Sequence, residues 1–147
     1  MSKSKFTVLV ADRGQALLYE TEKLGRRLQR VSTLTNPSAR GHERDLGASA
    51  PGRSFNRSAG VHQTLSQRTS LQDQATERFA RSIGRSLSQL GRSADCTGIV
   101  LVASPRLLSR IRKTLPRAVQ AKVVAEVPKD LVHQPQRLVV EHLQTLH

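Results

Sequence analysis

The sequence has one cysteine, no tryptophan and only four other aromatic residues among its 147 positions. A lone Cys96 excludes an internal disulfide and a cysteine-based zinc site. The longest unbroken apolar run is Ile99 to Ala103. It is far shorter than the roughly 20 residues that a membrane-spanning helix needs, so we expect no membrane insertion. The charged start, Met1 to Lys5, is followed by no secretory hydrophobic region, which predicts a cytoplasmic protein.

Acidic residues are also scarce: 11 Asp and Glu face 24 Lys and Arg, a formal net charge of +13. Arginine supplies 18 of the 24 cations. Such a balance favours polyanionic partners, because Lys and Arg displace counterions from a phosphate backbone. The alternative is that the charge only keeps a small protein soluble. The apolar fraction of 37% is spread along the chain, which indicates a folded domain rather than a basic tail.

Apolar segments with strand or helix periodicity follow one another in the order β-β-β-α-β-α-β-α. The strands are expected at 6–11, 16–21, 28–34, 98–103 and 121–127, and the helices at 71–90, 104–117 and from 135 onward. Three strands joined by tight turns form an antiparallel meander, and two right-handed crossovers then add parallel strands. The sequence therefore predicts an α/β fold with a mixed five-stranded sheet and ribonuclease H-like topology, in a single domain over 1–147.

A long segment at about 36–70 lacks convincing periodicity and is rich in Gly, Ser and Arg. A structureless segment of this length in a compact domain is usually functional or disordered. Ser70 and Asp73 resemble a capping box that would start the following helix. The segment carries five arginines: Arg40, Arg44, Arg53, Arg57 and Arg68.

Residues able to support catalysis are sparse. A metal nuclease on this topology needs several clustered carboxylates. Asp12 and Glu77 could supply two, but the end of the fourth strand reads Ala-Ser-Pro at 103–105, and Asp130 is isolated. Asp12 is better explained by Asp-x-Gly turn chemistry. No histidine has an i, i+4 partner, and no phosphate-loop glycine pattern is present. We therefore expect a protein that is not an enzyme and holds no metal or cofactor.

Four cations are spaced to lie together on the outer side of the helix expected at 104–117, where no acidic residue intervenes. They are Arg106, Arg110, Lys113 and Arg117. Arginine binds phosphate through two parallel hydrogen bonds, so the arginine preference suits RNA. With so few aromatics, binding should follow RNA shape and backbone charge rather than base stacking. These four residues and the five arginines of 36–70 form the predicted nucleic-acid-binding site.

Four segments, in order along the chain, resemble the bacterial host attachment protein family. They are Val8–Arg13, Pro51–Phe55, Val100–Leu108 and Lys129–Leu131. The resemblance covers about residues 6 to 146. It implies a requirement for adhesion to host cells, without implying that the protein is itself an adhesin.

The element order also resembles, more distantly, the central domain of archaeal and eukaryotic peptide-chain release factors. There, a loop at the position of 36–70 reaches the peptidyl-transferase centre. Their catalytic Gly-Gly-Gln is missing, and the nearest sequence here is Gly60-Val61-His62-Gln63. The resemblance implies docking on ribosomal RNA, tRNA or the ribosome.

Three functional hypotheses result from the sequence. The first is a non-catalytic RNA- or ribosome-binding protein. The second is a protein-interaction or regulatory factor connected with host attachment. The third is peptidyl-tRNA hydrolysis that would depend on Gln63.

Overall fold

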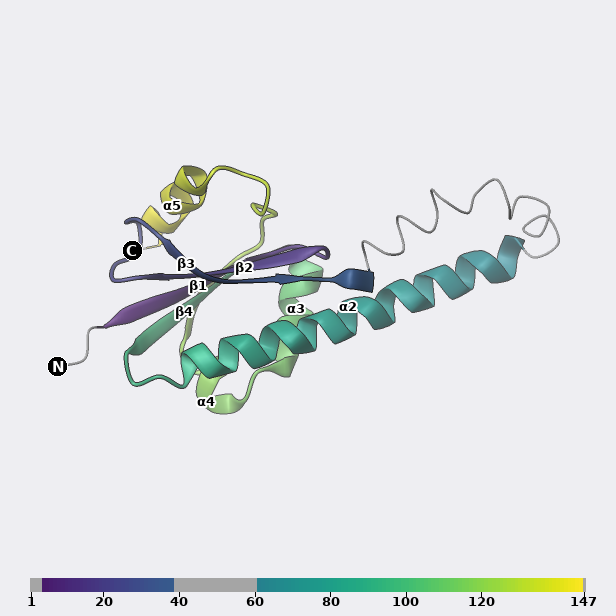
Figure 1. Cartoon of the computed structure of the whole chain (residues 1–147), viewed down its shortest axis with the longest axis horizontal. Helices are drawn as coiled ribbons and strands as arrows, with labels where there is room; N and C mark the ends of the chain where they lie inside the picture. The colour runs from purple at the N-terminus through teal and green to yellow at the C-terminus, as the bar shows by residue number, and fades with distance from the viewer. Residues whose placement is uncertain (1–3, 39–60, 147) are drawn as a thin grey trace.

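The computed structural model describes residues 4–38 and 61–146, except for the side chains of 61–70. Its five strands form one sheet in the order β3-β2-β1-β4-β5 (Figure 1). β1, β4 and β5 are parallel, whereas β2 is antiparallel to both β1 and β3. The strands are β1 Lys5–Ala11, β2 Gln15–Thr21, β3 Gln29–Thr35, β4 Cys96–Val102 and β5 Val123–Val127. The predicted meander and mixed five-stranded α/β sheet are confirmed.

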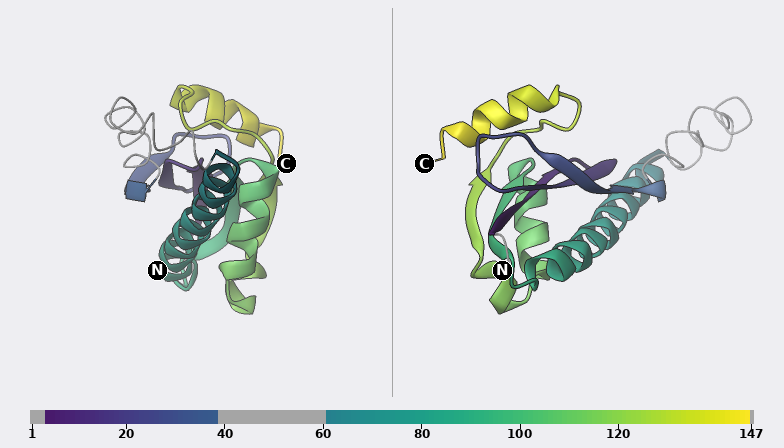
Figure 2. Two further views of the ribbon diagram at one scale, coloured as in Figure 1. Left: turned by 90° about the vertical axis from the view of Figure 1, so that its right-hand side faces the viewer. Right: turned by 60° about the vertical axis from the view of Figure 1, so that its left-hand side comes forward.

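Helices cover both faces of the sheet (Figures 1 and 2). α2 (Val61–Gly91), α3 (Pro105–Thr114) and α4 (Arg117–Gln120) lie on one face, and α5 (Gln136–Gln144) lies on the other. Side chains alternate between the faces along a strand, so Leu9 packs toward α2 while Val8 and Val10 pack toward α5. Burial on both faces explains why β1 and β4 are nearly continuous apolar runs.

The helix predicted to begin near Leu71 begins ten residues earlier, at Val61. The predicted loop at 36–70 is therefore wrong over 61–70, and Ser70 and Asp73 lie inside the helix rather than at its cap. Figures 1 and 2 show the reason: the first part of α2 extends beyond the sheet. Leu71 is 56% exposed, and full burial begins only at Phe79. Apolar periodicity marks contact with the sheet, not the length of a helix.

The helix predicted at 104–117 divides into α3 and α4 at a proline. Leu115 precedes Pro116 and adopts an extended conformation with ψ of 135°, as a residue before proline prefers. The predicted start is confirmed, because the Ser104 side chain accepts a hydrogen bond from the Leu107 amide and Pro105 opens α3. Within the described residues, no helix is both long and apolar enough to cross a membrane.

Candidate nucleic-acid interface

Three of the four cations predicted on the helix after β4 are exposed on α3 and α4. α3 buries Leu107, Leu108 and Ile111 against the sheet, so its remaining side chains face outward or sideways. Among the described residues, no carboxylate lies within ion-pair distance of Arg106, Lys113 or Arg117. We call these three residues the α3–α4 cations; their charge is available to an external anion.

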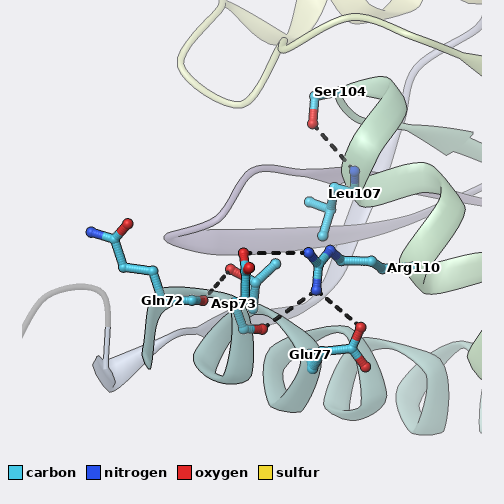
Figure 3. A network of polar contacts seen from close by, with 7 residues as sticks. Gln72, Asp73, Glu77, Ser104, Leu107 and Arg110 are labelled. Atoms are coloured by element: carbon cyan, nitrogen blue, oxygen red, sulfur yellow. Dashed lines mark hydrogen bonds and ion pairs between the residues drawn. The ribbon is translucent and has the colours of Figure 1, made fainter. Parts of the chain in front are cut away.

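Arg110 departs from the prediction that it lines the outer side with the other three. Its side chain is only 19% exposed and reaches across to α2 (Figure 3). One guanidinium nitrogen donates to Glu77 Oε1 at 2.9 Å, and another lies 3.5 Å from Asp73 Oδ1. Because α2 and α3 pack side by side, a position beside the buried stripe of α3 meets these carboxylates. Arg110 is thereby neutralised within the protein.

The five arginines of the predicted loop have side chains outside the part of the chain that the structure describes. Arg40, Arg44, Arg53 and Arg57 lie outside the described residues. Arg68 belongs to α2, but its side chain is likewise outside them, as is that of Gln63. These positions therefore remain predictions from sequence.

A second group of cations, which the sequence analysis did not single out, follows β2. Lys23, Arg26, Arg27 and Arg30 are all exposed. We call these four residues the basic turn. The stretch 23–30 reads Lys-Leu-Gly-Arg-Arg-Leu-Gln-Arg, with four cations and no acid. That local charge density is the sequence signal that marks this surface.

A cavity of about 550 Å³ lies where β1 and β3 end, beside α2 and the loop after β5. Asp12 has the turn role predicted for it: its Oδ1 accepts hydrogen bonds from the amides of Gly14 at 2.7 Å and Gln15 at 2.8 Å. Its Oδ2 lies 3.4 Å from His133 Nε2. Glu77, the other nuclease candidate, is engaged by Arg110. The described residues contain no group of three His, Cys, Asp or Glu side chains that could hold a metal.

Asp12 and His133 are expected to differ in their contribution to the free energy of unfolding. Asp12→Ala removes an acceptor of two backbone amides and should lower the free energy of unfolding by about 1–2 kcal/mol. His133→Ala removes only one contact, made by a side chain that is 74% exposed, and should change it by less than about 0.5 kcal/mol. Urea denaturation of the two variants checks this. A larger loss for His133→Ala than for Asp12→Ala would contradict the turn role.

The sheet order, the helices on both faces and the exposed cations define a small basic α/β protein with ribonuclease H-like topology. The chain belongs to the family described as protein required for attachment to host cells, whose model matches residues 7–143. This membership confirms the family resemblance noted in the sequence. No curated protein matches the chain.

Two solved structures are distantly similar in fold. The archaeal translation termination factor aRF1 is 12% identical with a TM-score of 0.45, over 83% of this chain and 29% of the factor. A second structure, described as an archaeal protein, is 11% identical with a TM-score of 0.46, over 96% of this chain and 36% of its own. The chain thus spans well under half of either structure, and the likeness concerns fold alone.

Proposed function

We propose that the protein is a non-catalytic, cytoplasmic RNA-binding protein that contacts phosphates through the α3–α4 cations. The observation that carries this proposal is that Arg106, Lys113 and Arg117 are exposed without carboxylate partners, on elements whose other cations are neutralised. Arg110 is held by Asp73 and Glu77, and Arg112 by Glu126. Free cations beside neutralised ones leave a local positive charge that a phosphate backbone can use.

The aromatic residues support phosphate contact over base stacking. Tyr19 and Phe79 are buried in the two halves of the core, and Phe6 is partly buried against one of them. Among the described residues, therefore, no exposed aromatic ring is available as a stacking platform. Structured RNA can be recognised by its shape and phosphates without one. Ribosomal RNA and tRNA are the proposed partners, because they are the abundant structured RNAs of a cytoplasm.

The salt dependence of RNA affinity tests this proposal. Affinity for RNA falls as the salt concentration rises, so the slope of log K against log salt is negative. Replacing all three α3–α4 cations by glutamine should reduce the magnitude of that slope by about 2, since each phosphate contact contributes roughly 0.7–0.9. Affinity for bulk tRNA and for ribosomal RNA is measured by filter binding over a salt series. The matched control, Arg92→Gln/Lys129→Gln/Arg137→Gln, also removes two arginines and one lysine, but from exposed positions elsewhere.

The proposed function fails if the unmodified protein binds neither RNA at low salt. The α3–α4 assignment fails if the triple variant and its control change the slope equally, because net charge alone would then explain the effect. Circular dichroism of both variants should match that of the unmodified protein, since all six side chains are exposed and unpaired among the described residues.

A second candidate function is favoured by the family membership, because the family is described by a requirement for attachment to host cells. In this alternative the protein is an interaction or regulatory factor whose cationic surface binds acidic proteins or anionic polymers. Fractionation of native cells discriminates the two. Co-sedimentation with ribosomes at low salt favours the RNA partner, whereas recovery of the native protein outside the cell favours the alternative.

A further inference from the structure

We propose that the basic turn is a second, preformed phosphate-binding surface, which holds a different segment of the same RNA from that held by the α3–α4 cations. The inference rests on the proposed function and adds a site to it. The basic turn connects β2 to β3 at the amino end of β1, on the other side of the sheet from α3 and α4.

Two leucines anchor the basic turn to the core. Leu24 and Leu28 are 7% and 3% exposed and pack with β1, β4 and α5. The chain around Leu24 makes a hydrogen-bonded turn: the Thr21 hydroxyl donates to the Lys23 carbonyl at 2.8 Å, and the Arg26 amide donates to the same carbonyl at 3.2 Å. Burial of the leucines therefore leaves the neighbouring cations on the surface.

α5 holds the backbone of the turn from the other side. Gly25 has φ of +89°, which favours glycine, and a Cβ there would lie 2.6 Å from Gln144 Cγ. The Gln144 carboxamide donates to the Gly25 carbonyl at 3.0 Å, and that of Gln136 donates to the Leu28 carbonyl. A turn already held in place loses little conformational entropy when it binds a ligand.

The charge around the turn points to an anion. A groove of about 760 Å³ runs beside it and is lined by five cations, the four of the basic turn and Lys5, against the carboxylates of Glu20 and Glu22. Glu20 pairs with Lys5 at 3.6 Å. The five cations outnumber the two carboxylates, so the lining of the groove has a net positive charge. Clustered like charges repel one another, and a bound phosphate backbone relieves that repulsion.

An extended polyanion suits this surface better than a small anion. The cations are spread over a turn and the start of a strand, whereas a single phosphate needs donors that converge on one point. Tyr19, which pairs in register with Arg30, is buried. The surface can therefore hold phosphates without stacking bases, in agreement with the proposed function.

The test replaces Lys23, Arg26, Arg27 and Arg30 by glutamine and measures the salt slope for ribosomal RNA. The slope is expected to fall by about 3, at roughly 0.7–0.9 for each contact. The matched control replaces Arg85, Arg92, Lys129 and Arg137, which are also three arginines and one lysine at exposed positions. Because the two surfaces lie on opposite sides of the sheet, the losses from this variant and the α3–α4 triple variant should add.

A charge-preserving variant separates positioning from charge. Gln144→Ala frees the Gly25 carbonyl and is expected to weaken binding several-fold while leaving the salt slope unchanged. Equal slopes for the quadruple variant and its control would overturn the inference. The proposed function would survive that result, since it depends on RNA binding by the unmodified protein.

Discussion

Replacing Gly84 by alanine is expected to lower the free energy of unfolding by about 1–3 kcal/mol, the range for overpacking a well-packed core. Gly84 is buried where α2 passes α3, and a Cβ there would lie 2.0 Å from Thr114 Oγ1 and 2.8 Å from Thr114 Cβ. At an exposed helix position, the same substitution stabilises by about 1 kcal/mol. The two helices must therefore separate or Thr114 must move, and both loosen the core.

Urea denaturation of Gly84→Ala measures the loss, and a second substitution tests its cause. Thr114→Ala removes the closest atom of the clash, so in the Gly84→Ala background it should recover part of the stability. In the unmodified background it removes the hydrogen bond that the Thr114 hydroxyl donates to the Ile111 carbonyl at 2.7 Å. A Gly84→Ala variant as stable as the unmodified protein would show that α2 and α3 do not approach this closely.

Arg110→Glu is expected to lower the free energy of unfolding by about 2 kcal/mol. The substitution removes charge-assisted hydrogen bonds, each worth roughly 1.5–3 kcal/mol, and sets three carboxylates together. Asp73 and Glu77 are each 53% exposed, so solvent screening reduces the repulsion between them and the new side chain. The loss should therefore shrink in 1 M salt, which denaturation at two salt concentrations measures.

A charge exchange identifies the contact that is responsible. Glu77→Arg in the Arg110→Glu background restores an opposite-charge pair and should recover part of the stability. Arg110→Met, which keeps the apolar stem, should cost less than Arg110→Glu. If Arg110→Glu abolished RNA binding with unchanged stability, Arg110 would belong to the RNA surface instead. This structural role is the reason that the α3–α4 triple variant leaves Arg110 in place.

Much of the fold could be predicted because its signals are local. The apolar runs of β1 and β4 reflect burial on two faces, and Ser104-Pro105 specifies the start of α3 through hydrogen bonding and backbone restriction at adjacent residues. The early start of α2 could not be predicted in the same way. Its first turns project beyond the sheet, so they need no apolar stripe.

The same distinction between local sequence signals and tertiary contacts applies to the candidate site. Local sequence determined that α3 would carry cations on its unburied positions. The charge density of residues 23–30 is equally local, although the basic turn was not predicted from it. Which of those cations remain free was decided by the tertiary structure. The packing of α2 beside α3 brings Asp73 and Glu77 to Arg110 across more than thirty residues of chain, and α5 brings Gln144 to Gly25 from the far end of the sequence. Periodicity and spacing act over a few residues, whereas charge neutralisation depends on which elements become neighbours in space.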